Sequence, residues 1–182
     1  MDQDKRLDGL IDRLVRAGLS AKADRNGELQ IGGITADSRQ VKEKTLFICK
    51  GYGFKKEYLL SAQEKGACCY ISEMTYEDVK IPCIQVSDVR KASSLAAQWF
   101  YGDPAEKMTV VGITGTKGKT SAANILKHIF DVATARRTAL FSTGRVDTVG
   151  MQYDTHLTTP EPVELQQYFA EAAGSGCRQV VM

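Results

Sequence analysis

A glycine-rich stretch, VVGITGTKGKTS at residues 110–121, constrains the fold of this chain more than any other feature. Its glycines allow the backbone to curl until several N–H groups point inward, and such a cradle can hold a phosphate. The apolar residues before the loop predict a buried strand over Met108–Ile113, and the pattern after it predicts a helix over Thr120–Val132. A strand, a glycine-rich loop and a helix in this order predict a phosphate-binding loop, or P-loop, at Gly112–Thr120.

Two residues of this loop have side chains suited to a nucleotide. The ammonium of Lys119 can lie between the β- and γ-phosphates of ATP, and the hydroxyl of Thr120 can bind Mg²⁺, which prefers oxygen ligands. The strict pattern G-x-x-x-x-G-K-[ST] requires a glycine where this chain has Ile113, because Gly112 lies one residue too early. A chance G-K-T in a surface turn is the alternative, but the flanking strand and helix favour the phosphate site.

Composition argues against several classes of function. The chain has 182 residues and is 43% apolar, enough for one large or two small packed domains. Its 24 Lys and Arg nearly balance its 22 Asp and Glu, so we expect neither nucleic acid nor a membrane as a partner. The sequence lacks a membrane-length apolar run and a secretory signal, and we therefore expect a cytoplasmic protein. Five cysteines without a C-x-x-C pair predict free buried thiols, and a metal site or disulfides are the alternative: Cys49, Cys68, Cys69, Cys83 and Cys177.

Helical and strand-like patterns alternate along the first part of the chain, which indicates an α/β fold. The helical face Leu7, Leu10, Ile11, Leu14 and Val15 ends near Gly18, and a polar turn follows at Asn26-Gly27. The next elements expected are strands at 46–49, 67–71 and 81–86 and helices at 58–65 and 89–101.

A break at 102–104, Gly-Asp-Pro, precedes a second α/β unit. After the P-loop helix we expect a strand at 138–142, a looser stretch at 144–159 and a helix at 162–173. The last strand expected, Gln179–Met182, is cut short, so we expect the chain to be truncated, naturally or by design.

The loop ITGTKGKTS resembles the ATP-binding loop of the Mur ligase family, whose signature is G-T-x-G-K-T. The resemblance implies that ATP and Mg²⁺ bind there, with Lys119 catalytic and Thr120 a metal ligand. It also implies that ATP activates a carboxylate as an acyl phosphate, which an amine then attacks to give an amide. The residues implied for nucleotide binding are Gly115, Thr116, Lys117, Gly118, Lys119, Thr120 and Ser121.

Residues 36–51, ADSRQVKEKTLFICKG, resemble the uridine-nucleotide-binding N-terminal domain of these ligases, which carries D-S-R and then L-F and a glycine. The resemblance implies substrate contacts from Asp37, Ser38 and Arg39. Alone, D-S-R is also typical of a polar turn in which Asp caps the backbone. Family members often carry D-G-H where this chain has Phe54-Lys55-Lys56, so we expect weaker uridine binding than in the family.

The stretch LTTPEP at 157–162 resembles the T-T-P-[DE] motif of the branch that adds the third peptide residue to UDP-N-acetylmuramoyl-L-Ala-D-Glu. The resemblance implies that Thr158, Thr159 and Glu161 contact this substrate. A plain helix start, with Thr as N-cap and Pro in the first turn, is compatible with the same residues. His156 lies two residues before this threonine pair, but as a lone histidine in a loop it is not assigned to the site.

Together, these observations predict an α/β chain with a UDP-substrate-binding domain at 1–106 and the start of a parallel-sheet ATP-binding domain at 107–182. The implied partners are UDP-N-acetylmuramoyl-dipeptide and a diamino acid, L-lysine or meso-diaminopimelate. A related ligase of the folylpolyglutamate or cyanophycin type, or a nucleotide-binding module without catalysis, is the alternative. We expect that the 182 residues alone do not catalyse ligation, because the family's acidic Mg²⁺ ligand would come after Met182.

Overall fold

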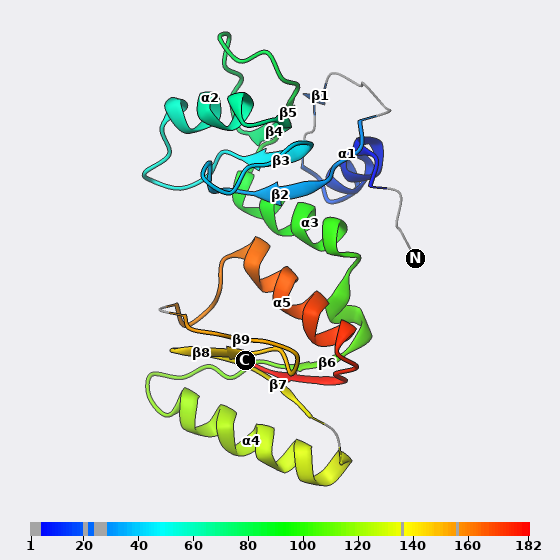
Figure 1. Ribbon diagram of the computed structural model, residues 1–182, viewed down its shortest axis with the longest axis vertical. Helices are drawn as coiled ribbons and strands as arrows, with labels where there is room; N and C mark the ends of the chain where they lie inside the picture. The colour runs from blue at the N-terminus through cyan, green and yellow to red at the C-terminus, as the bar shows by residue number, and fades with distance from the viewer. Residues whose placement is uncertain (1–4, 20–21, 24–28, 136, 156) are drawn as a thin grey trace. The chain divides into compact units, whose positions relative to one another are not determined.

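The structure is a computed structural model that describes residues 5–19, 22–23, 29–135, 137–155 and 157–182 (Figure 1). The turn expected at Asn26-Gly27 lies outside these residues. The chain forms two compact units, Met1–Phe100 and Tyr101–Met182, and each has a five-stranded sheet with helices. The α/β fold class is therefore confirmed, while the functional assignment of the two domains remains a prediction.

The first unit has a mostly parallel sheet in the strand order β1-β5-β4-β3-β2, in which only β1 among the described strands is antiparallel to its neighbour. Its elements are α1 (Leu7–Arg16), β1 (Lys22–Ala23), β2 (Gly33–Thr35), β3 (Thr45–Ile48), α2 (Lys56–Glu64), β4 (Ala67–Ser72), β5 (Cys83–Gln85) and α3 (Val89–Tyr101). Parallel strands place their carboxyl ends at one edge of a sheet. The segments that follow β2, β3 and β4 therefore meet at that edge.

Apolar periodicity explains the helices of this unit. Leu7, Leu10, Ile11 and Leu14 bury one face of α1, as the spacing predicts. Val15 is 52% exposed and does not belong to this face. At about 100° per residue it lies about 80° from Leu7, at the margin of the buried stripe.

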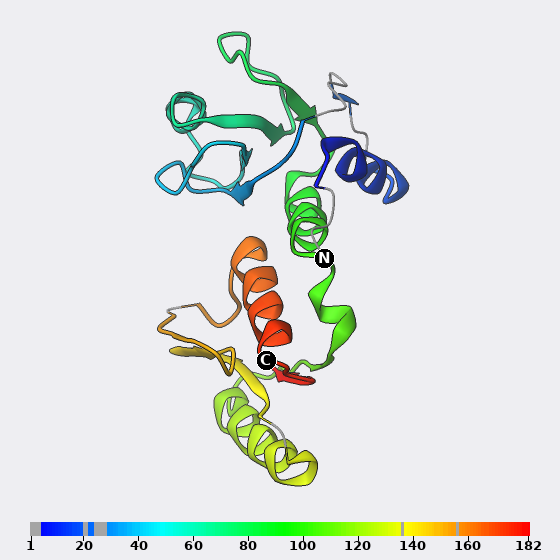
Figure 2. The same cartoon turned by 45° about the vertical axis from the view of Figure 1, so that its right-hand side comes forward.

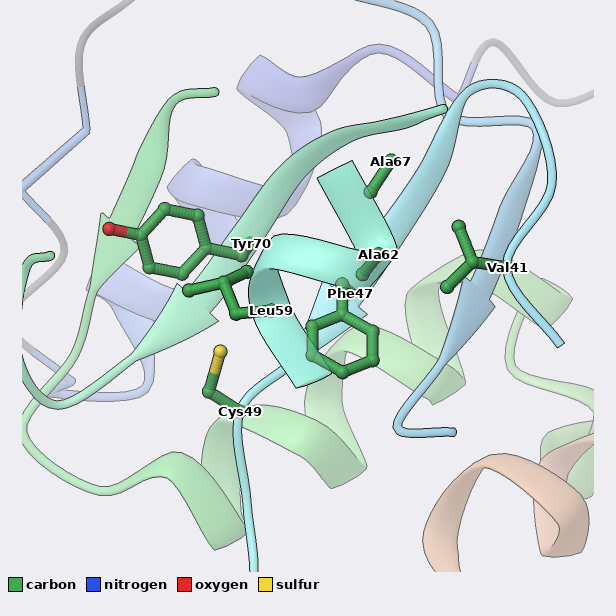
Figure 3. Close-up of a cluster of buried hydrophobic side chains, with 7 residues drawn as sticks. All are labelled: Val41, Phe47, Cys49, Leu59, Ala62, Ala67 and Tyr70. Atoms are coloured by element: carbon green, nitrogen blue, oxygen red, sulfur yellow. The ribbon is translucent and has the colours of Figure 1, made fainter. Parts of the chain in front are cut away.

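One buried cluster of the first unit lies between α2 and the sheet (Figure 3). Every residue of β3 is buried, which is typical of a parallel strand covered on both faces. The buried cluster consists of Val41, Phe47, Cys49, Leu59, Ala62, Ala67 and Tyr70.

The second unit has the strand order β6-β10-β7-β8-β9. Strands β6, β10 and β7 are parallel, and β7, β8 and β9 form an antiparallel meander. The elements of this unit are η1 (Pro104–Lys107), β6 (Thr109–Val111), α4 (Lys119–Thr134), β7 (Ala139–Ser142), β8 (Arg145–Asp147), β9 (Gln152–Tyr153), α5 (Pro162–Gly174) and β10 (Gln179–Val181). The stretch expected to be loose, 144–159, thus contains two strands. The meander explains this, because each strand of it hydrogen-bonds to its neighbour.

Helices α4 and α5 cover opposite faces of this sheet (Figures 1 and 2). Alternate residues of the strands face the two helices, as a strand period of two requires. Leu140 and Val181 pack with Ala123 of α4, whereas Phe141 and Val180 pack with residues of α5 such as Phe169.

The strand before the P-loop is shorter and more exposed than predicted. It spans Thr109–Val111 rather than 108–113, and Val110 is 38% exposed. The prediction of a buried strand was wrong because, among the described residues, β6 pairs with β10 alone and forms the edge of the sheet.

All five cysteines are free thiols, as predicted, and three of them are buried while Cys68 and Cys83 are half-buried. No helix in the described parts of the chain combines the length and apolar character needed to cross a membrane.

Candidate nucleotide-phosphate site

The glycine-rich loop connects the carboxyl end of β6 to the first turn of α4. Helix α4 begins at Lys119, one residue before the predicted start, and Gly118 precedes it with a φ of 78°. An L-residue with a side chain is strained at this angle, whereas glycine adopts it readily. A Cβ at Gly118 would contact nothing within 4 Å, so there is room for a side chain. The backbone conformation, and not a lack of space, therefore requires glycine at this position.

Lys119 and Thr120 lie in the first turn of α4, where the helix favours anions. The Lys119 ammonium donates a hydrogen bond of 2.6 Å to the carbonyl of Gly115, which keeps the charge over the loop. The Asn124 side chain donates to the Thr120 carbonyl at 2.8 Å and supports the same turn. The loop is therefore closed on itself by its own lysine, and a phosphate would have to compete with Gly115 for that ammonium.

A pocket of about 360 Å³ lies beside this turn, at the carboxyl ends of β6 and β7. Because both strands run parallel to β10, their carboxyl ends share one edge of the sheet. The polar side chains that line the pocket come from three segments: Thr114, Lys119, Thr120, Ser142, Thr143, Thr158 and Thr159.

The two threonines of the LTTPEP stretch contribute to the pocket rather than to the helix cap. Helix α5 begins at Pro162 with Glu161 at the N-cap position, so a threonine N-cap is wrong although proline in the first turn is confirmed. Thr158 instead accepts a hydrogen bond of 3.3 Å from the hydroxyl of Thr143. The structure thus brings Thr158 and Thr159 to the same pocket as the P-loop lysine.

Several residues predicted for the site do not line this pocket. Thr116, Lys117, Gly118 and Ser121 are exposed around the loop outside it. Glu161 is also exposed and outside the lining, and its main-chain carbonyl accepts the N–H of Leu165 at 2.8 Å. His156 lies outside the described residues.

The D-S-R residues form a compact turn after β2 in the first unit. Asp37 accepts hydrogen bonds from the Arg39 backbone at 2.9 Å and from its guanidinium at 2.7 Å, so the capping turn is confirmed. The Arg39 guanidinium, and then its backbone N–H, lower the pKa of Asp37 from 3.8 to about 2. The Ser38 carbonyl accepts a hydrogen bond of 2.9 Å from the Lys65 ammonium. The Ser38 hydroxyl takes no part in the hydrogen bonds between Asp37 and Arg39 that form the turn.

A second crevice, of about 370 Å³, lies where β3 and β4 end and α3 begins. Tyr52 and Phe54 contribute aromatic rings to it, and Glu73 and Asp88 contribute carboxylates. Asp88 accepts the N–H of Arg90 at 3.0 Å, and Glu73 accepts an N–H of the same helix start. Lys50 and Arg90 also line this crevice at the start of α3, so it combines charges of both signs with aromatic surface.

No motif in the sequence indicated this crevice, and Asp37, Ser38 and Arg39 are not among its lining residues. A usable signal was present, because polar and glycine-containing turns follow two neighbouring parallel strands, and ligands bind at such strand ends. Of the unusual Phe54-Lys55-Lys56 stretch, only the phenylalanine lines the crevice, while Lys56 pairs with Asp78.

The edge of parallel strands, the glycine-rich loop and the helix with Lys119 and Thr120 in its first turn define a P-loop nucleotide-binding fold. Residues 113–182 match the Mur ligase middle domain. The chain is 40% identical over 161 residues to a UDP-N-acetylmuramoyl-L-alanyl-D-glutamate–L-lysine ligase of Enterococcus faecalis, covering 88% of this chain and 32% of the relative. It is 41% identical over 161 residues to a UDP-N-acetylmuramyl-tripeptide synthetase of Ligilactobacillus salivarius, covering 85% of this chain and 31% of the relative.

Among solved structures, a UDP-N-acetylmuramoyl-L-alanyl-D-glutamate–2,6-diaminopimelate ligase is similar with a TM-score of 0.69 and 22% identity. This likeness covers 87% of this chain and 33% of the solved one, and it supports the fold. The chain belongs to the Mur ligase family. It spans about a third of the length of the relatives that it matches.

Proposed function

We propose that this chain provides the nucleotide site and the acceptor-substrate site of an ATP-dependent ligase of peptidoglycan precursor synthesis. The reaction joins a diamino acid to UDP-N-acetylmuramoyl-L-Ala-D-Glu with release of ADP and phosphate. The relatives named as L-lysine ligases favour L-lysine over meso-diaminopimelate as the amine. Because its substrates are ATP and a nucleotide-linked precursor, we propose the cytoplasm as its location.

One observation carries this proposal: the P-loop and the threonine pair line one pocket. Lys119 and Thr120 come from the loop that suits phosphates, and Thr158 and Thr159 come from a segment about forty residues later. Phosphoryl transfer to a carboxylate requires the two reacting groups to lie side by side. A pocket lined by an ammonium and by hydroxyl groups meets this requirement, because both kinds of group hydrogen-bond to anionic oxygens.

Four residues of the pocket have roles in this scheme: Lys119, Thr120, Thr158 and Thr159. The Lys119 ammonium would leave the Gly115 carbonyl and bind the phosphate oxygens, where it would stabilise the charge that develops during transfer. The hydroxyls of Thr158 and Thr159 would orient the acceptor carboxylate. Thr120 would contribute an oxygen ligand to Mg²⁺, which supplies neutralisation of phosphate charge when bound.

The first unit would hold the uridine nucleotide of the acceptor. The hydrogen bonds that Asp37 accepts from Arg39 shape the turn that carries the Ser38 hydroxyl. The crevice at the ends of β3 and β4, which the Asp37–Arg39 turn does not line, would offer aromatic surface from Tyr52 and Phe54 to a planar base.

A calorimetric titration tests the proposal with two ligands, UDP and UDP-N-acetylmuramoyl-L-Ala-D-Glu, each in the presence of MgADP. The unaltered chain should bind the muramoyl dipeptide more tightly than UDP. The double variant Thr158→Val/Thr159→Val should lose about tenfold in affinity for the dipeptide and keep its affinity for UDP, because only pocket hydroxyls are removed. Thr109→Val, which removes an exposed hydroxyl from β6, serves as the matched control.

Equal affinities of the unaltered chain for UDP and for the muramoyl dipeptide would contradict an acceptor site at the threonine pair. An absence of MgADP binding would contradict the nucleotide site itself.

A further inference from the structure

Ser142 is a buried polar residue of the pocket that belongs to none of the sequence motifs. It is the last residue of β7 and is 9% exposed. Its hydroxyl donates a hydrogen bond of 3.4 Å to the hydroxyl of Thr120, and both residues line the pocket.

The backbone positions of these two hydroxyls are fixed by the core of the second unit. Thr120 lies in the first turn of α4, and that helix packs on β7 through a buried cluster that includes Ala123 and Leu140. The Asn124 side chain also holds the Thr120 carbonyl. The remaining freedom of Thr120 is therefore mainly the rotation of its side chain about χ1.

Rotation about χ1 decides whether the Thr120 oxygen faces the pocket. A threonine in a helix divides between two χ1 rotamers, since its hydroxyl can also turn to a carbonyl of the preceding turn. A hydrogen bond from the end of β7 selects one of these rotamers. Each hydroxyl can donate or accept, so the Thr120 proton can turn to Ser142 when a cation takes a lone pair of Thr120.

We propose that Ser142 is a positioning residue for the divalent cation of the bound nucleotide, acting through the hydroxyl of Thr120. The inference rests on the proposed function and adds to it a residue outside the P-loop. The fit is chemical, because Mg²⁺ takes oxygen ligands and groups that hydrogen-bond to a ligand orient it toward the metal. Loss of Ser142 should therefore weaken the contribution of Mg²⁺ to nucleotide affinity and leave contacts to the phosphates intact.

The test measures ADP binding to the full 182-residue chain by calorimetry, once with Mg²⁺ and once with EDTA. The readout is the ratio of the two dissociation constants, which is the gain in affinity from Mg²⁺. Ser142→Ala should reduce this gain about two- to tenfold, the value of one hydrogen bond, without changing the affinity in EDTA. Ser142→Thr, which keeps a hydroxyl at this position, should restore the gain.

Two further measurements separate positioning from a general structural role. The Mn²⁺ electron paramagnetic resonance spectrum of the nucleotide complex should change in Ser142→Ala and not in the control Thr134→Val. That control removes a hydroxyl from the far end of α4, where it donates to the Phe130 carbonyl. Circular dichroism checks folding, and Ser142→Cys replaces Ser142→Ala if the alanine variant does not fold.

An equal Mg²⁺ gain in the unaltered chain and in Ser142→Ala would overturn the inference. A uniform loss of affinity, with and without Mg²⁺, would also overturn it, because it would show a purely structural role. A chain that binds no nucleotide in either condition would instead refute the proposed function, and the inference with it.

Discussion

Replacing Lys119 by alanine is the most direct test of the phosphate site. In the structure the ammonium lies over the loop and donates to the Gly115 carbonyl at 2.6 Å. This carbonyl belongs to an exposed residue, so water can replace the lysine there when the side chain is removed. The variant should therefore fold normally and lose affinity only for the nucleotide phosphates.

The size of the loss follows from two opposing contributions. A charge-assisted hydrogen bond to phosphate contributes about 1.5–3 kcal/mol to binding. When phosphate binds, the ammonium gives up the bond to the Gly115 carbonyl that it makes in the free chain, which offsets about 1 kcal/mol. The net loss is then about 0.5–2 kcal/mol, so the dissociation constant of MgADP should rise about 2- to 30-fold.

Calorimetric titration of MgADP into the unaltered chain and Lys119→Ala measures this ratio. Lys107→Ala removes one positive charge from an exposed position at the end of η1 and is the matched control for net charge. A rise in the dissociation constant confined to Lys119→Ala would support the assignment. Equal affinities for the unaltered chain and Lys119→Ala would refute the reasoning that places phosphate on this lysine.

The remaining predictions concern stability and titration. Phe47→Ala, which empties a fully buried position in the core of the first unit, should lower the free energy of unfolding by about 3–5 kcal/mol in urea denaturation followed by tryptophan fluorescence. Gly118→Ala should lower the free energy of unfolding by about 1 kcal/mol, because the φ of Gly118 is 78°. Gly174→Ala, near the end of α5, should leave the free energy of unfolding unchanged or raise it. Equal effects of the two substitutions would contradict the argument from backbone strain at Gly118. Because the folded-state pKa of Asp37 is about 2, below its ordinary 3.8, its contribution to stability is present above pH 3.8 and is lost as pH falls toward 2. Arg39→Gln should return this pKa toward 3.8 in a carboxyl NMR titration, and an unchanged midpoint would show that another group lowers it.

Local patterns in the sequence were sufficient for the order and type of most elements. The α/β alternation was confirmed, and so was the strand, loop and helix around the P-loop, because each depends on periodicity and glycine placement within a short window. The buried face of α1 followed from spacing, except for Val15 at its margin. The turn at Asp37 followed from the habit of Asp to bond the backbone two residues on.

Burial and long-range strand pairing could not be predicted from these local sequence patterns. The exposure of Val110 depends on β6 lying at the edge of the sheet, and a strand's neighbours in a sheet are not encoded in the strand itself. The hairpin strands β8 and β9 were missed because their pairing with β7 gives them their structure, while their short, mixed sequences carry little strand signal.

The candidate site divides in the same way. The sequence by itself determined which residues are suited to phosphate, since Lys119 and Thr120 are neighbours at the start of one helix and their geometry is local. Only the tertiary structure decided that Thr158 and Ser142 join them, because parallel pairing of β6, β10 and β7 brings distant strand ends to one edge. A hydrogen bond between Ser142 and Thr120 spans 22 residues of sequence, and no spacing rule predicts a contact that depends on how a helix packs across a sheet.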